Sequence, residues 1–257
     1  MVAVVTLGID LASPLQAKRT ATCKVEWSDS KAHALDVILG GDDEVLLARI
    51  CGADRVGIDA PFGWPDEFVD AVVAHKTLRC WPDCSVNTLR LRETDRFVKS
   101  ETALNPLSVS ADKIGVTAMR AAKLLSRLAA AGQPVDRTGS GRLVEVYPAA
   151  ALKRWGFPHK GYKKTNASEK RRALVAAIET RTATWLHLQD HVREACEVND
   201  DALDALIAAL VARAAALNLC EPIPQESKER AGREGWIALP KLGSLDNLVR
   251  DSLSPRV

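Results

Sequence analysis

Residues 2–9 read VAVVTLGI and are followed at once by Asp10. A nearly continuous run of apolar and β-branched residues is typical of a central strand that is buried on both faces. Asp10 carries the first ionisable side chain of the chain and interrupts this run. The segment therefore predicts a buried strand that presents a carboxylate at its carboxyl end.

The next segments predict three further strands and one helix. Residues 20–27 (TATCKVEW) and 34–39 (ALDVIL) are β-prone, and their short connections favour antiparallel pairing with the first strand. Residues 42–50 begin with acidic side chains, as the helix dipole favours, and look helical. Residues 55–59 (RVGID) predict a fourth, short strand that again ends on an aspartate.

The second half of the chain predicts mostly helices. A proline-containing irregular stretch follows the fourth strand, so residues of about 61–140 are expected to form a helical insertion. Residues 142–147 (RLVEVY) predict a fifth strand with Glu145 inside it. The expected later helices cover residues 111–131, 149–155, 167–188 and 200–218. We predict one α/β domain over residues 1–257, with helices around a mixed five-stranded sheet whose first three strands are antiparallel.

The composition excludes several classes of protein. The chain has 257 residues, of which 47% are hydrophobic and 26% charged, and a disordered chain needs less hydrophobicity and more net charge. No segment approaches the roughly 18 apolar residues of a membrane span. Six cysteines without a CxxC pair favour reduced thiols. We therefore expect a cytoplasmic protein without a membrane partner, and a homodimer is left open.

The formal net charge of +2 hides strong local sorting of charge. Residues 153–172 hold eight basic residues and one acidic residue, a balance of +7, whereas residues 190–204 hold six acids and one arginine, a balance of −5. Trp155 and Tyr162 are interleaved with the basic residues. This pattern favours a phosphate-binding strip with stacking partners, and a solvated helix and loop is the alternative.

Acidic residues occupy unusual places in the predicted elements. Asp10 and Asp59 end strands, Glu145 lies within one, and Asp201 and Asp204 lie in the first turns of the last helix. A carboxylate in a buried element costs several kcal/mol unless a partner compensates it. Each acid either finds its own basic partner or shares bound cations with the others. Convergent carboxylates suit hard metals, and two Mg²⁺ or Mn²⁺ ions about 4 Å apart can clamp a phosphodiester.

Short motifs that run through most of the chain resemble a known family. They are Gly8-Ile-Asp10, Gly57-Ile-Asp59-Ala-Pro-Phe-Gly-Trp-Pro65, Arg92-Glu-Thr94-Asp95-Arg96, Glu145-Val-Tyr-Pro-Ala149, Gly161-Tyr-Lys163 and Asp201-Ala-Leu-Asp204-Ala. The order of elements resembles the ribonuclease H fold, and the last helix resembles that of the RuvC-type resolvases. More closely, the chain resembles the family called domain of unknown function 429, which is described as predicted ribonuclease H-like nucleases.

The resemblance implies a metal-dependent nuclease that cleaves DNA or RNA with two Mg²⁺ or Mn²⁺ ions. It implies that the ions are held by Asp10, Asp59, Glu145 and Asp204, and that the catalytic set also includes Asp201. The helical angle instead favours Asp200 as the second acid of the last helix, and this choice is left open. The resemblance and the basic strip together suggest that substrate is bound by Arg92, Asp95, Lys160, Lys163 and Lys164. Arg92 fits a phosphate bidentately, but a structural pair between Arg92 and Asp95 fits the sequence equally well.

Two other functions and two other metal sites are alternatives. The Gly-x-Asp strand end also occurs in actin-like and sugar-kinase-like phosphotransferases and ATPases, and the fold also serves non-catalytic nucleic-acid-binding proteins. His187 and His191 are four residues apart in a predicted helix, a spacing that can bind zinc, although solvated side chains are the favoured interpretation. Cys80 and Cys84 lack a second matching pair, so a zinc site there is not expected.

Overall fold

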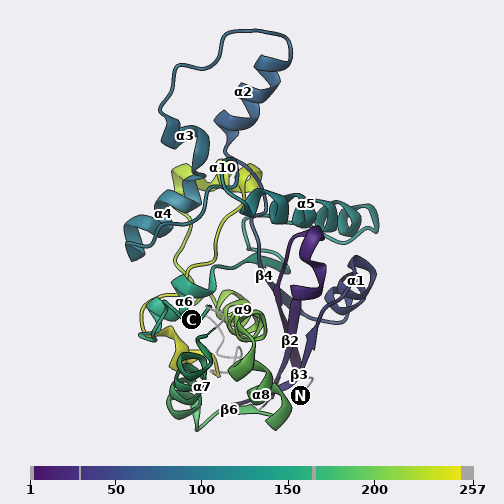
Figure 1. The fold of residues 1–257 in the computed structure, drawn as a ribbon, viewed down its shortest axis with the longest axis vertical. Helices are drawn as coiled ribbons and strands as arrows, with labels where there is room; N and C mark the ends of the chain where they lie inside the picture. Colours follow the sequence, from purple (N-terminus) through teal and green to yellow (C-terminus); the bar gives the residue numbers. More distant parts are fainter. Residues whose placement is uncertain (1–2, 29, 164–165, 250–257) are drawn as a thin grey trace, which may run out of the picture.

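The structure, a computed structural model, describes residues 3–28, 30–163 and 166–249. It is an α/β fold in which helices cover both faces of a mixed six-stranded sheet of order β5-β4-β1-β2-β3-β6 (Figure 1). The strands are β1 (Val4–Asp10), β2 (Ala21–Ser28), β3 (Lys31–Leu39), β4 (Arg55–Asp59), β5 (Leu143–Glu145) and β6 (Leu186–Leu188).

The α-helices alternate with the strands only in part, and most of them follow β4. They are α1 (Asp43–Cys51), α2 (Asp66–Lys76), α3 (Val86–Arg90), α4 (Glu93–Thr102), α5 (Ile114–Ala130), α6 (Pro148–Arg154), α7 (Ser168–Thr182), α8 (Asp190–Val198), α9 (Asp200–Ala216) and α10 (Lys228–Glu234). The side chain of Asp42 caps α1 by accepting hydrogen bonds from two backbone N–H groups of its first turn.

The strand directions follow from the lengths of the connections. The first three strands are joined by short connections and pair antiparallel, as predicted. β4 returns parallel to β1 after the crossover through α1, and β5 pairs parallel to β4. β6 pairs parallel to β3 at the other edge of the sheet.

The two faces of the sheet are covered by different groups of helices. On one face, Leu7 and Ile9 of β1 pack with residues of α1 and α5, and on the other face β2 and β3 pack with residues of α6, α7, α8 and α9. Alternating residues of β1 therefore serve separate cores, because successive side chains of a strand point to opposite faces. This explains why the first strand reads as a continuous apolar run.

Helix α9 lies directly against the middle of the sheet. A Cβ atom at position 8 would overlap the backbone oxygen of Ala205, and one at position 57 would overlap that of Ala208. Gly8 and Gly57 are paired neighbours in β1 and β4, so together they form a surface without side chains on which the helix backbone packs closely. Residues 201–214 of α9 are all buried, so the helix is enclosed all round.

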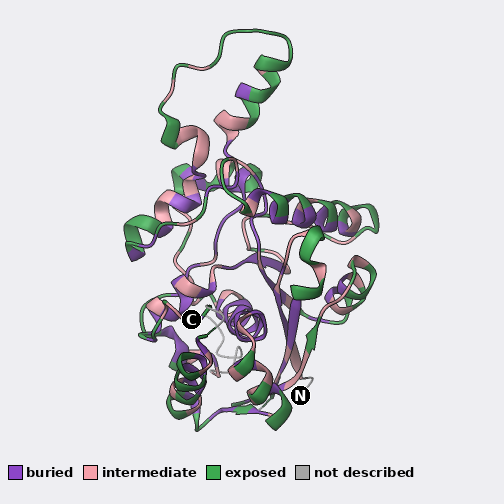
Figure 2. Cartoon of the chain, viewed as in Figure 1, coloured by how far each residue is buried: buried purple, intermediate pink, exposed green. Residues whose placement is uncertain are grey.

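The predicted insertion contains helices α2 to α5, but only α5 joins the core described above. Figure 1 shows α2 and α3 projecting away from the sheet, and most of α2 is exposed (Figure 2). Helix α4 packs instead against α6 and α10. The insertion therefore adds both a cover for one sheet face and a projecting arm.

The sixth strand corrects the predicted strand count of five. Residues 167–188 were expected to form one helix, but α7 ends at Thr182 and Leu186–Leu188 form β6. The buried Leu186 and Leu188 flank the exposed His187, which is the alternation of an edge strand rather than of a helix. Among the described residues, no helix combines the length and apolar character that crossing a membrane requires.

Candidate functional site

Three carboxylates meet at the carboxyl ends of β1 and β4. Asp10 and Asp59 are paired across the two parallel strands, two residues beyond the paired glycines, and they point to the same face. Because α9 rests on these glycines, its Asp204 reaches the same point. One oxygen from each of Asp10, Asp59 and Asp204 lies within 4.8 Å of the others.

Asp204 is bound by two neighbouring residues of the segment before α7. The hydroxyl group of Tyr162 donates a hydrogen bond of 2.8 Å to Asp204 Oδ1, and the Lys163 ammonium forms an ion pair with Asp204 Oδ2. Nearly half of the Lys163 side chain is exposed, so its stem borders solvent while its charged end meets a buried carboxylate. Among the described residues, none donates a hydrogen bond to the side chain of Asp10 or Asp59.

The electrostatics of the cluster favour an added positive charge. Burial raises the pKa of Asp10 well above its ordinary value, and the charges of Asp59 and Asp204 raise it further. Burial raises the pKa of Asp59 to about 7, although the Lys163 ammonium opposes this shift. Burial also raises the pKa of Asp204 against the effect of Lys163. One lysine therefore does not balance three carboxylates.

The structure does not bring Glu145 into this cluster. Its carboxylate is buried and faces Arg92, which donates hydrogen bonds of 2.7 and 2.9 Å to it. The backbone N–H of Phe62 donates a third, of 2.9 Å. Glu145 is thus bound by an arginine that it shares with Asp95, and the sequence offered no means to distinguish this from metal ligation.

Arg92 and Asp95 form the structural pair that was one of two alternatives for them. Asp95 accepts hydrogen bonds from Arg92 Nε at 3.2 Å and from Arg92 Nη2 at 2.9 Å. The guanidinium also donates to the backbone oxygen of Glu234 at 3.2 Å, and only 2% of Arg92 is exposed. The donors of Arg92 are thus used by groups inside the protein, although Arg92 and Asp95 also contribute to the wall of a hollow.

Asp201 and Asp200 lie beside the cluster but outside it. Arg19 donates two hydrogen bonds to Asp201, of 2.7 and 3.1 Å, and lies 3.7 Å from Asp200. Arg19 is the last residue of the 3₁₀ helix Pro14–Arg19, and no feature of the sequence pointed to it. The structure therefore gives Asp201 a partner of its own and leaves Asp204 as the acid of α9 that reaches the cluster.

The basic segment 153–172 does not form one continuous strip. Arg154 and Arg171 are buried and bonded to neighbouring parts of the fold, whereas Lys160 is exposed. Lys164 lies outside the described residues. Trp155 and Tyr162 were predicted to be exposed stacking partners. Instead both are buried, with Trp155 hydrogen-bonded to Ser244 and Tyr162 to Asp204. Periodicity does not reveal which basic residues face inward.

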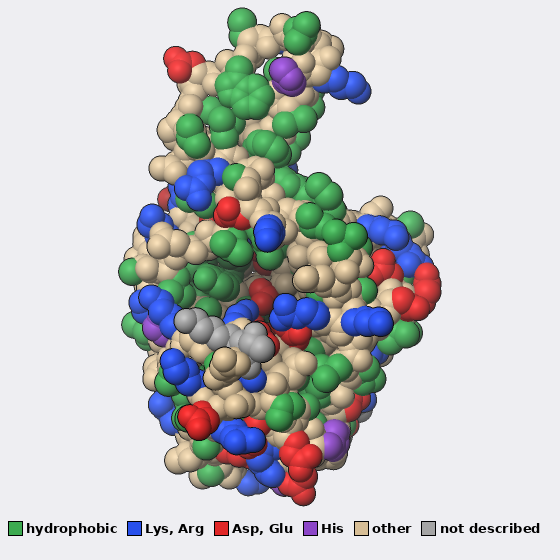
Figure 3. Space-filling view, viewed as in Figure 1, with side chains coloured by type: hydrophobic (Ala, Val, Ile, Leu, Met, Phe, Trp, Pro, Cys, Tyr) green, Lys and Arg blue, Asp and Glu red, His purple; other side chains and the backbone are tan. Residues whose placement is uncertain are grey.

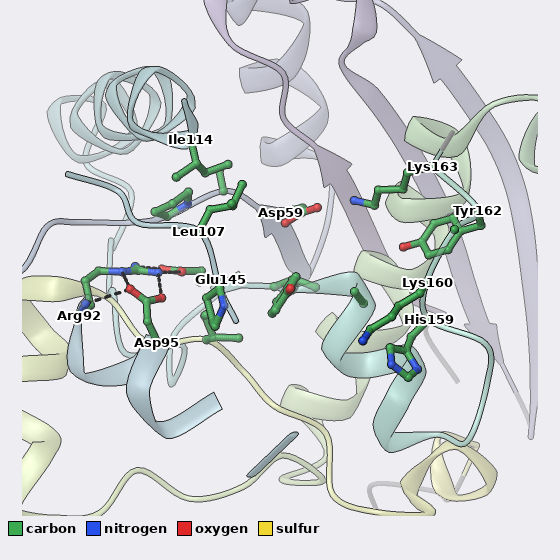
Figure 4. Close-up of a pocket in the computed structure, with 18 residues that line it drawn as sticks. Asp59, Arg92, Asp95, Leu107, Ile114, Glu145, His159, Lys160, Tyr162 and Lys163 are labelled. Atoms are coloured by element: carbon green, nitrogen blue, oxygen red, sulfur yellow. Dashed lines mark hydrogen bonds and ion pairs between the residues drawn. The ribbon is translucent and has the colours of Figure 1, made fainter. Parts of the chain in front are cut away.

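Two hollows meet at the carboxylate cluster, and both are lined by Asp59 and Lys163. The larger, of about 600 Å³, also exposes Asp10, Asp200 and Asp201. The smaller, of about 380 Å³, lies between β5, the insertion and residues 159–163 (Figure 4). Figure 3 shows acidic side chains deep in the middle of this face, with lysine and arginine side chains around them.

The alternative zinc sites have no support among the described residues, where the carboxylate cluster is the group with metal-ligand geometry. His187 lies in β6 and His191 in α8, so they do not share the helix that was predicted, and His187 contacts His33 instead. Cys80 and Cys84 are free thiols.

Comparison with known proteins shows the family. Neither a curated protein nor a solved structure matches the chain. The model of one family, described as protein of unknown function (DUF429), matches residues 8–229, which include Asp10, Asp59 and Asp204. The chain therefore belongs to the DUF429 family.

Proposed function

We propose that this protein is a metal-dependent nuclease with a ribonuclease H-like fold. The observation that carries the proposal is the meeting of Asp10, Asp59 and Asp204 within 4.8 Å at the edge of a hollow. The strand order supports it, because β1 to β3 are antiparallel and β4 and β5 are added parallel to β1. In this interpretation β6 is an addition at the far edge.

The residues of the cluster fit Mg²⁺ or Mn²⁺. Asp10, Asp59 and Asp204 offer hard oxygen donors, and burial raises the pKa of each, so a divalent cation would remove a strong repulsion. Such ions, when bound, activate water and stabilise the leaving oxygen of a phosphodiester. Glu145 is not needed as a ligand, because Arg92 already binds both of its carboxylate oxygens.

The chain's own residues would orient this site. Tyr162 and Lys163 each bind one oxygen of Asp204, so its carboxylate keeps one orientation. Lys163 lines both hollows and lies where a phosphate would approach the carboxylates. Arg19 binds Asp201 and adds a second positive charge to the wall of the larger hollow. These two cations would attract the nucleic-acid backbone.

A nuclease assay with Mg²⁺ or Mn²⁺ tests the proposal. The parent protein is expected to cleave a DNA or RNA oligonucleotide, and Asp10→Asn and Asp204→Asn are each expected to reduce cleavage by at least about a hundredfold, since a metal ligand is lost. Asp246→Asn is the matched control, because Asp246 pairs with Arg181 on the surface. Cleavage that survives both cluster substitutions would overturn the proposal.

The same assay separates the two groups of acids. Asp201→Asn leaves the three-carboxylate cluster intact, so we expect a cleavage loss of about tenfold or less. An equally severe loss for Asp201→Asn and Asp204→Asn would show instead that the catalytic set includes Asp201 as well as Asp204.

A further inference from the structure

The smaller hollow is mostly apolar, although it adjoins a highly charged cluster. Its apolar walls include Pro61, Pro106, Leu107, Ile114, Tyr147 and Ile237. Asp59 and Lys163 belong both to this hollow and to the larger one that holds Asp10. A ligand in the apolar space would therefore reach the carboxylates with one end.

Polar groups lie at defined places around this space. In Figure 4, Leu107 and Ile114 lie on one side, His159 and Lys160 on the opposite side, and Asp59 between them. Two tyrosines line the hollow. Tyr162 is buried and donates to Asp204, whereas Tyr147 is half-buried.

We propose that this hollow receives one unpaired nucleotide of the substrate. The base would lie among the apolar walls against Tyr147, and its phosphate would lie toward Lys163 and the carboxylates. The exposed Lys160 would face the next phosphate of the strand. The inference rests on the nuclease function proposed above and names its substrate class as single-stranded or unpaired nucleic acid.

The size and chemistry of the hollow favour this occupant. A volume of about 380 Å³ lies near the lower end of the range for small-molecule sites, about 300–1,000 Å³, so it fits one nucleotide rather than a duplex. A base inside a duplex is stacked on both faces and must be extruded, at a cost of a few kcal/mol, before it can enter such a space. An unpaired base meets no such cost and gains stacking on an aromatic ring.

The first test compares substrates for the full chain with Mn²⁺. Single-stranded DNA and RNA oligonucleotides and blunt duplexes of the same sequence are offered separately. At least one single-stranded substrate is expected to be cleaved ten times faster or more than its duplex, and an unpaired end added to the duplex is expected to restore cleavage. Equal cleavage of single strand and blunt duplex would overturn the inference while the proposed nuclease function stands.

The second test uses Tyr147 and does not require turnover. Each of the four deoxynucleoside 5′-monophosphates is titrated into the protein with Mn²⁺, and the Kd is measured by calorimetry. Tyr147→Ala is expected to raise the Kd for the tightest mononucleotide about tenfold, which corresponds to the loss of one base–aromatic contact. Tyr147→Phe is expected to restore binding, because the ring is retained.

Trp81→Ala is the matched control, since Trp81 is an exposed aromatic residue outside both hollows. The Kd for Mn²⁺ is measured for every variant, and an unchanged value for Tyr147→Ala shows that the carboxylate cluster is intact. If mononucleotide binding depends on Tyr147 but no substrate is cleaved, nucleotide binding in the smaller hollow would be supported and the proposed nuclease function would be contradicted. Absence of mononucleotide binding, or binding that Tyr147→Ala leaves unchanged, would overturn the inference.

Discussion

The ionised carboxylate of Asp59 lowers the free energy of unfolding by an amount that depends on pH. Burial raises its pKa from 3.8 to about 7 in the folded protein. Between these two values the folded state holds a proton that the unfolded state has released, so the free energy of unfolding falls as the pH rises. In the absence of a bound cation, this destabilisation is therefore complete above pH 7 and has largely vanished near pH 4.

Removing this charge is expected to stabilise the metal-free protein. Asp59→Asn should raise the free energy of unfolding at pH 8 by at least about 1 kcal/mol, and by less at pH 5, because the amide keeps the shape without the charge. Urea unfolding with a chelator at both pH values measures this difference. A variant that is less stable than the parent at pH 8 would show that the Asp59 carboxylate is stabilised rather than strained.

Lys163 is expected to compete with a divalent ion for Asp204. Lys163→Gln removes the ammonium that pairs with this carboxylate, so the metal-free protein should lose about 1 kcal/mol of stability. Saturating Mn²⁺ should then raise the Tm by more than it does in the parent, since ions bind the folded state without that competitor. Lys160→Gln provides the control, because Lys160 is exposed.

A Mn²⁺-induced rise in Tm that is smaller in Lys163→Gln than in the parent would contradict this competition. It would mean that the orientation of Asp204 by Lys163 outweighs the competition of its ammonium group with the ion.

At the level of single residues, the sequence predicted the positions of the acidic side chains better than those of the basic side chains. Asp10, Asp59 and Asp204 were expected together, and the structure brings them within 4.8 Å. Glu145 was expected there too, but Arg92 lies next to it in space although 53 residues separate them in the chain. Local patterns identify a buried charge, but they do not identify its distant partner.

At the level of elements, the contact of α9 with the sheet depends on glycine. Gly8→Ala would force a methyl group against the backbone of α9, which cannot yield as a flexible side chain can. We expect a loss of about 3 kcal/mol or more in the free energy of unfolding, together with weaker Mn²⁺ binding as Asp204 moves away. Urea unfolding and calorimetry measure the two effects.

Substitution of Gly232 by alanine is expected to have the opposite effect on stability to Gly8→Ala. Gly232 lies in α10, and a Cβ there would meet nothing within 4 Å. Gly232→Ala is therefore expected to stabilise the protein by about 0.5–1 kcal/mol. If Gly8→Ala proved as harmless as Gly232→Ala, the close packing of α9 on β1 would be contradicted.

The strands of the first 60 residues were predicted well, because burial and alternation mark them directly. The sixth strand was missed because it has three residues and follows α7 after a short turn, so its pattern merged with that of the helix. The enclosure of α9 was also missed. The burial of α9 depends on the helices packed around it, and the sequence of α9 itself has no periodic pattern that would indicate these contacts.

On the scale of the whole molecule, Arg92 joins three distant segments. It is the N-cap residue just before α4 of the insertion, and it donates hydrogen bonds to Glu145 of β5 and to the backbone oxygen of Glu234 at the end of α10. Removing one partner of a buried ion pair leaves the other charge uncompensated. Arg92 is therefore expected to matter for stability rather than for substrate binding.

Arg92→Ala should lower the free energy of unfolding by about 3–5 kcal/mol. The surface pair of Arg181 and Asp246 is the contrast, and Arg181→Ala should cost about 1 kcal/mol or less. Urea unfolding at neutral pH measures both. A stable Arg92→Ala protein with weakened oligonucleotide binding would instead favour the role of Arg92 in holding a phosphate.

The position of α9 in the chain has a consequence for synthesis on the ribosome. The helix that covers the middle of the sheet and supplies Asp204 begins only at residue 200, although the strands that it covers are complete by residue 59. Chains grow at about 5–20 residues per second, so the emerging sheet spends many seconds with one apolar face uncovered. Nascent chains should therefore depend on chaperones until α9 emerges, and a nascent chain that lacks α9 cannot hold the assembled acidic cluster.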